Sequence, residues 1–174
     1  MASLEIGLLR RDLEPFQIEL AEENYLNLAG LKDEMDSARI FEKYAHLFSK
    51  EAVATVSQAK QDAKDGDDSR MLRYLLRFSA EGYLEDAVKS LTDKSLTFQA
   101  RSVIDLDGVE IPFRSIPVKL RNEPNAAVRK RLFDAEMHEV VKLNEILLER
   151  MSLMHQTSAD LGFRSYKDMI SSLT

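Results

Sequence analysis

One short segment of the chain carries residue types that could do metal chemistry. Residues 137–145 read MHEVVKLNE, and the His138–Glu139 pair matches the start of a helical zinc-peptidase motif. That motif needs a second histidine four residues after the first, so that both imidazoles reach one Zn²⁺ while the glutamate acts as general base. Position 142 holds Lys142, whose ammonium group has no lone pair to donate. We therefore expect neither catalytic nor metal-binding residues in this chain, and no cofactor bound by it.

The other candidate metal ligands also lack suitable spacing. No histidine has a second histidine or a suitable carboxylate three or four residues after it. The histidines are His46, His138 and His155. The segment DLDGVE suggests a calcium loop, but aligning Gly108 with the sixth loop position places Val103 first and Arg114 twelfth, where carboxylates are required. A tight hairpin turn accounts for the same residues.

A cluster of basic residues is the charge feature that suggests binding. Six basic side chains lie within 18 residues, against the single acid Glu123. They are Arg114, Lys119, Arg121, Arg129, Lys130 and Arg131. One interpretation is that they are solvated helix and strand residues, some of them paired with acids elsewhere in the chain. The other is that they form a contact for an anion or an acidic peptide.

Composition excludes several classes of function. The 174 residues carry a formal net charge of −6, and no aromatic side chains alternate with the basic cluster, so we expect no nucleic-acid partner. The chain contains no cysteine, which excludes disulfides, thiol catalysis and thiolate metal sites. No apolar run approaches the roughly 18 residues of a membrane span, and the N-terminal residues lack a signal-peptide pattern. The expectation is a cytoplasmic protein without a membrane partner.

The spacing of apolar residues predicts helices over most of the chain. The first is expected to run from Asp12, its N-cap, to Gly30, and its expected buried side chains are Phe16, Ile18, Leu20, Tyr25, Leu26 and Leu28. Asp36 or Ser37 is expected to cap a second helix, and a third follows shortly afterwards. A fourth helix contains Gly82, which predicts close helix packing or a local bend there.

A change to alternating apolar residues predicts a β-hairpin at about 102–114. Asp107–Gly108 lies between the two alternating runs and is a strong signal for a tight turn. Because a two-stranded hairpin is marginal alone in water, its apolar side must pack on helices. The expected fold is therefore mainly α: residues 1–174 as one elongated multi-helix domain, with a small hairpin and one long helix in the C-terminal half.

The long helix is expected over about 124–161, which is about 55 Å at 1.5 Å per residue. Asn122 is its expected cap, with Pro124 in the first turn and Gly162 ending it. Nine residues at alternating steps of four and three predict a seam: Phe133, Met137, Val140, Asn144, Leu147, Met151, Met154, Ser158 and Leu161. If this seam is left uncovered, it favours a homodimer; if the first four helices cover it, a monomer results.

Four segments, in this order, resemble the N-terminal helical region of bacterial zinc metallopeptidases of the thimet oligopeptidase and oligoendopeptidase F family. They are YLNLAGLKDEMDSARIFEKYAHLFSKEAV, LRFSAEGYLEDAVKSLTDK, DLDGVEIPFRSIPVKLRNEPN and LGFRSYKDMI. The resemblance extends from about residue 15 to the end. In that family the His-Glu-x-x-His helix and a downstream glutamate ligand lie in a catalytic region beyond this part. No catalytic or metal residue can therefore be assigned to this chain from the family.

The resemblance implies a helical fold that forms part of one wall of a deep peptide-binding channel. The zinc would belong to the missing catalytic region, which makes a peptide or that region the implied partner. The expected function is thus a non-catalytic helical domain that takes part in peptide hydrolysis only when the catalytic region completes it. The alternative is a stand-alone helical module that binds proteins or peptides.

Overall fold

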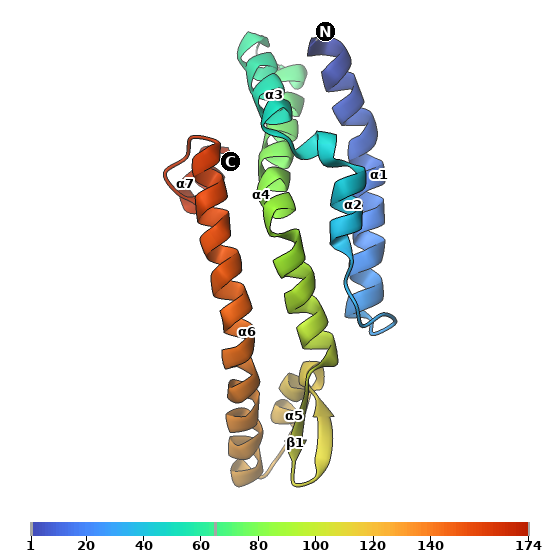
Figure 1. The fold of residues 1–174 in the computed structure, drawn as a ribbon, viewed down its shortest axis with the longest axis vertical. Helices are drawn as coiled ribbons and strands as arrows, with labels where there is room; N and C mark the ends of the chain where they lie inside the picture. Colours follow the sequence, from blue (N-terminus) through green and yellow to red (C-terminus); the bar gives the residue numbers. More distant parts are fainter. Residues whose placement is uncertain (1, 65, 174) are drawn as a thin grey trace.

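Three long helices lie side by side and set the length of the molecule. In the computed structural model, which describes residues 2–64 and 66–173, they are α1 (Ala2–Leu28), α4 (Asp67–Arg101) and α6 (Ala126–Asp160). Figure 1 shows α4 in the middle, with α1 on one side and α6 on the other. The predicted fold, mainly α and elongated with a small hairpin and a long helix in the C-terminal half, is confirmed.

Helix α1 begins earlier than the sequence suggested. It starts at Ala2, so Asp12 is not its cap and Pro15 lies in its interior. The side chains turned toward the neighbouring helices repeat at steps of three and four from the first turns onward: Ile6, Leu9, Leu13, Phe16, Leu20, Glu23 and Asn27. This continuous stripe explains the early start, because a helix is stabilised mainly by packing its buried face.

The prediction of which side of α1 is buried was partly wrong. Ile18, Tyr25 and Leu28 were expected inside, but they are 59%, 65% and 63% exposed. The polar residues Glu23 and Asn27 take the buried positions instead. A pattern based on apolar residues alone cannot identify such positions, because they are buried only where partners satisfy their hydrogen bonds.

Short helices between α1 and α4 pack an aromatic core. They are α2 (Ser37–Lys43), the 3₁₀ turn η1 (Ala45–Phe48) and α3 (Lys50–Asp62). Asp36, one of the two predicted caps, caps α2 by accepting a hydrogen bond from the backbone N–H of Arg39. The ring of Phe16 packs edge-on against four aromatic rings of the later elements: Phe41, Tyr44, Phe48 and Phe78. These contacts hold α1 to α2, η1 and α4.

Close packing at Gly82, one of the two predicted alternatives, is present. A β-carbon placed on Gly82 of α4 would overlap the ring of Phe48. Phe48 is itself buried, so its ring has little room to move away. The glycine therefore lets η1 lie directly against the backbone of α4.

The hairpin forms where the sequence predicted it. Strands β1 (Val103–Leu106) and β2 (Val109–Pro112) pair antiparallel, with Ile104 opposite Ile111. Asp107 and Gly108 form the turn with φ of 57° and 81°, the left-handed conformation that the favoured two-residue hairpin turn requires. Ile104 and Ile111 are buried in a small core with Ile116 and Leu132, so the apolar side of the hairpin does pack on helices.

One short helix was not predicted. After the turn η2 (Phe113–Ser115), α5 (Ile116–Asn122) begins with a proline in its first turn. Asn122 therefore ends α5 and does not cap α6. Asn125 is the cap, accepting hydrogen bonds from the N–H groups of Ala127 and Val128. A last helix, α7 (Tyr166–Leu173), packs against α4 and α6.

The buried face of α6 is shifted by one residue from the predicted seam. Six residues of the helix are buried: Leu132, Leu143, Ile146, Met154, Thr157 and Ser158. Of the predicted seam, Phe133, Asn144, Leu147 and Met151 are exposed. One residue corresponds to a rotation of about 100° around a helix, so much of the predicted seam lies beside the contact with α4.

Candidate functional site

The His138–Glu139 pair has no metal-site geometry. Glu139 Oε1 lies 2.5 Å from Lys142 Nζ, so the residue in the second-ligand position forms an ion pair with the would-be general base. His138 is exposed on α6. Within residues 2–64 and 66–173, no group of three or more His, Cys, Asp or Glu side chains could hold a metal ion.

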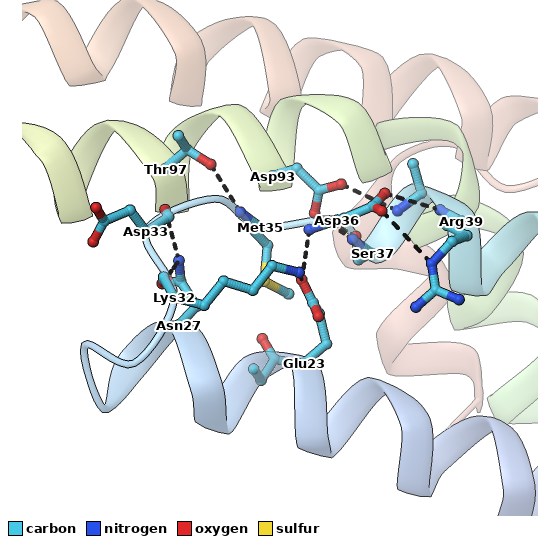
Figure 2. Close-up of polar contacts among 12 residues, drawn as sticks. Glu23, Asn27, Lys32, Asp33, Met35, Asp36, Ser37, Arg39, Asp93 and Thr97 are labelled. Atoms are coloured by element: carbon cyan, nitrogen blue, oxygen red, sulfur yellow. Dashed lines mark hydrogen bonds and ion pairs between the residues drawn. The ribbon is translucent and has the colours of Figure 1, made fainter.

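A network of largely buried hydrogen bonds connects residues 35–38, at the start of α2, to α4 (Figure 2). Asp93 of α4 accepts hydrogen bonds from Ser37 N at 3.1 Å, Ser37 Oγ at 2.5 Å and Ala38 N at 3.1 Å. One turn further along α4, Thr97 Oγ1 accepts from Met35 N at 3.0 Å. Because Asp93 is 9% exposed, its carboxylate acts as a buried anchor for the first turn of α2.

The same network includes two buried polar residues of α1, which Figure 2 shows facing the 31–36 loop. Glu23 Oε1 accepts from Lys32 Nζ at 2.5 Å and from Asp36 N at 2.8 Å. Burial alone would raise the pKa of Glu23, but these two hydrogen bonds outweigh it and hold the pKa below its ordinary value. Asn27 Nδ2 donates to the carbonyl oxygens of Lys32 and Asp33.

Arg114, one of the predicted contact residues, belongs to this internal network. Its Nη1 donates to Asn27 O at 2.7 Å, and its Nη2 donates to Asn27 Oδ1 at 2.7 Å and to Leu96 O at 3.0 Å. The guanidinium thereby joins η2 to the end of α1 and to α4. Its five N–H donors make arginine suited to linking several backbone carbonyls, so Arg114 acts as a structural link.

Three further basic residues have partners near the start of α6. Arg129 donates to two backbone carbonyl oxygens of the α5–α6 connection, at 2.7 and 2.9 Å. Lys130 lies 2.6 Å from Asp134, and Arg131 Nη1 lies 2.7 Å from Asp107 at the hairpin turn. Lys119 and Arg121 of α5 are exposed and have no ion pair within the part of the chain that the structure describes. The six residues thus do not act as one set: Lys130 and Arg131 form ion pairs, Arg114 and Arg129 donate to neutral oxygens, and among the described residues Lys119 and Arg121 have neither kind of partner.

Lys119 borders an open groove between the hairpin, α5 and α6, at the lower end of the molecule in Figure 1. The groove has a volume of about 330 Å³ and is lined by Leu106, Ile111, Val118, Lys119, Asn122, Glu123, Val128 and Leu132. Five of the lining side chains are apolar, Lys119 adds a positive charge, and Glu123 adds a carboxylate that accepts a hydrogen bond from the backbone N–H of Asn125. Such a surface suits an apolar side chain next to a carboxylate.

A second candidate surface runs along α6 and is called the α6 face here. Its large apolar side chains and their exposed fractions are Phe133 50%, Val141 63%, Leu147 39%, Leu148 70% and Met151 42%. Half-buried Met137 and Val140 lie between them on the same side of the helix. An apolar stripe of this length, here interrupted by Asn144, is typical of a surface that another polypeptide covers.

One contact joins residues far apart in the chain and was not predicted. His46 Nε2 lies 2.9 Å from Asp12 Oδ2, at the edge of a pocket of about 180 Å³ that Ser49 also lines. The Arg11 guanidinium, and to a lesser degree His46, holds the pKa of Asp12 below its ordinary value. Ser49 Oγ accepts from the backbone N–H of Ala52, so this serine acts as a helix cap. His46 and Asp12 are 34 residues apart in the sequence, so no local sequence pattern predicts their contact.

Comparisons with known proteins assign no role to these surfaces. No protein-family model matches the chain, and neither the curated proteins nor the solved structures that were searched gave a match. Among the described residues, no helix combines the length and the apolar composition that crossing a bilayer requires.

Proposed function

We propose that this chain is a non-catalytic, peptide-binding helical module. It would correspond to the N-terminal channel wall of an oligopeptidase-type zinc metallopeptidase and would contribute to peptide hydrolysis only beside a catalytic region that holds the zinc. The groove between the hairpin, α5 and α6 carries the proposal, because it combines an apolar lining with an unpaired lysine.

The groove favours a particular peptide chemistry. Leu106, Ile111 and Val128 offer apolar contacts for a leucine or phenylalanine side chain. Lys119 stands on α5 at the edge, where its ammonium group can meet an acidic residue next to that side chain. Peptides with apolar residues flanked by acids are therefore the proposed ligands, and basic peptides are disfavoured.

Fluorescence anisotropy with a labelled peptide tests the proposal. A short peptide with leucine flanked by glutamates is expected to bind saturably, and the same peptide with lysines in place of the glutamates to bind at least about tenfold more weakly. Lys119→Glu should weaken binding of the acidic peptide by a similar factor, whereas Lys64→Glu, in the α3–α4 loop away from the groove, should leave it unchanged. Equal affinity of the two peptides, or of Lys119→Glu and the unmodified chain, would contradict the proposal.

A protein-interaction module is the second candidate function. The exposed α6 face favours it, since apolar side chains on a solvent-facing helix gain free energy when a partner covers them. This function needs neither the groove nor a catalytic region.

A further inference from the structure

Six residues of the α6 face form three apolar pairs about Asn144. Val141 and Leu147 lie three residues before and after it, and Val140 and Leu148 lie four residues before and after it. Met137 and Met151 lie seven residues before and after it. Phe133, eleven residues before Asn144, has His155 at the corresponding position after it and so stands outside these pairs.

These pairs make the face self-complementary, so a second copy of the chain fits it. In a two-fold interface the same patch serves both subunits, so that residue i contacts j while j contacts i. Antiparallel pairing of two α6 helices about Asn144 places Met137 against Met151, and Val140 against Leu148, of the other copy. We propose that the chain forms an antiparallel homodimer through the α6 face, with the two Asn144 side chains adjacent at the two-fold axis.

The dimensions of the face fit a reversible dimer. The residues from Phe133 to Met151 span about 27 Å at 1.5 Å per residue, which is long enough for several layers of contacts. From the exposed fractions of its side chains, the face would remove on the order of 1,000 Å² of apolar surface from water over two copies. That area lies at the lower end for specific interfaces, so we expect association in roughly the micromolar range.

Polar residues define the register. Asn144 is exposed in the middle of an apolar stripe, and a pair of asparagines at one interface position fixes register at a cost in affinity. Glu145 follows it on the edge of the face and is also exposed. The antiparallel two-fold places the two Glu145 side chains near each other, so their repulsion also weakens the dimer.

Cysteine cross-linking tests this arrangement, because the chain has no cysteine of its own. Asn144→Cys should form a disulfide-linked dimer under mild oxidation, since only a residue at the axis meets its own copy. Val140→Cys is the matched control. In the dimer its two copies would lie about 12 Å apart along the helix axis, beyond the roughly 4.4–6.8 Å between α-carbons that a disulfide spans. Combining Val140→Cys with Leu148→Cys should restore the cross-link. Cross-linking of the Val140→Cys variant as readily as Asn144→Cys would overturn the antiparallel pairing.

Sedimentation equilibrium tests whether the dimer forms at all. The mass of the full chain should rise from 19.9 kDa toward twice that value with concentration. Leu148→Glu and Met151→Glu should each keep it at the monomer mass with unchanged helicity, while Ile18→Glu on the exposed side of α1 should leave dimerisation intact. Glu145→Gln should tighten association several-fold at low salt. A monomer at every concentration, even at high protein concentration, would overturn the proposal.

The inference rests on the second candidate function and is independent of the groove. Lys119→Glu should dimerise normally, and Met151→Glu should bind the acidic peptide normally. Loss of peptide binding with intact dimerisation would therefore contradict only the peptide-binding proposal, and the reverse result would contradict only the dimer.

Discussion

Lys142 occupies the place on α6 where a zinc-peptidase helix carries its second histidine, and it forms an ion pair with Glu139. The neighbouring His138 is exposed, so its imidazole is accessible to metal ions in solution. A single imidazole holds Zn²⁺ weakly, because protein sites that retain zinc supply at least three ligands.

We predict that the chain retains far less than one zinc per molecule after dialysis. Lys142→His places two imidazoles four residues apart on an exposed helix, so this variant should bind zinc measurably more tightly than the unmodified chain. Lys142→Gln is the control and should not gain binding. Metal analysis and competition with a chromogenic chelator provide the measurement, and one tightly held zinc in the unmodified chain would contradict the prediction.

Glu23 should make the stability of the fold depend on pH. Its pKa in the folded state lies below the ordinary value of 4.5, so the folded state binds this proton less readily than the unfolded state does. The stabilisation is therefore fully present above about pH 4.5 and is lost as the pH falls through the lower folded-state pKa. Glu23→Gln should cost about 1–2 kcal/mol of unfolding free energy at pH 7.

The difference between Glu23→Gln and the unmodified chain should then shrink as the pH is lowered below 4.5, which urea unfolding at several pH values measures. Glu22→Gln, one residue away on the exposed side of α1, is the control. A difference that stays constant from pH 7 to pH 3 would show that the charge of Glu23 contributes nothing.

At the scale of single elements, the contact between η1 and α4 depends on the missing side chain of Gly82. Alanine in a helix interior is usually about 1 kcal/mol more stable than glycine, so propensity alone would make Gly82→Ala stabilising. Because its β-carbon would overlap the buried Phe48 ring, we predict a net loss of about 1–3 kcal/mol instead.

Gly7→Ala provides the matched control for this prediction. Gly7 lies in α1, and a β-carbon there would meet nothing within 4 Å. This substitution should stabilise the fold by up to about 1 kcal/mol. Thermal or urea unfolding compares the two variants, and equal shifts would mean that Phe48 relaxes away without cost.

At the scale of the whole molecule, the buried apolar residues within the described part of the chain form three clusters distributed along α4 and α6. One joins α1, α2, η1, α3 and α4; a second joins α4, α6 and α7; the third joins the hairpin, α5 and α6. Figure 1 shows the hairpin and α5 at the opposite end of the molecule from α3. This separation allows the hairpin end to open without unfolding the α1–α3 end.

Ile116→Ala tests that separation. Ile116 is fully buried in the third cluster, so removing its side chain should cost about 2–5 kcal/mol locally. Amide hydrogen exchange should become faster in β1, β2, α5 and the start of α6, with little change in α3. Val118→Ala, a neighbouring exposed residue of α5, should change little. Faster exchange throughout the chain would instead indicate a single cooperative unit.

The sequence by itself determined the features that depend on local interactions. The Asp107–Gly108 turn, the Asp36 cap and the end of α6 before Gly162 were all predicted, because each rests on backbone conformations or hydrogen bonds within a few residues. The groove was not predicted: Lys119 was one of six candidate contact residues in the basic cluster, and α5, which carries it, was not expected.

Only the tertiary structure decided which side of each helix is buried. On α6, the predicted seam and a second stripe displaced by one residue both satisfy the four-and-three spacing. The more apolar stripe, the seam, was predicted to be buried. The buried stripe instead includes the half-buried Glu139 and Arg150, and Arg150 becomes compatible with this side of the helix because it bonds to Glu85 and Thr92 of α4. Arg114 likewise donates a hydrogen bond to Asn27, which lies 87 residues away in the sequence. Such polar residues can be buried only beside partners that the fold brings from elsewhere in the chain, and their own sequence neighbourhood carries no trace of those partners.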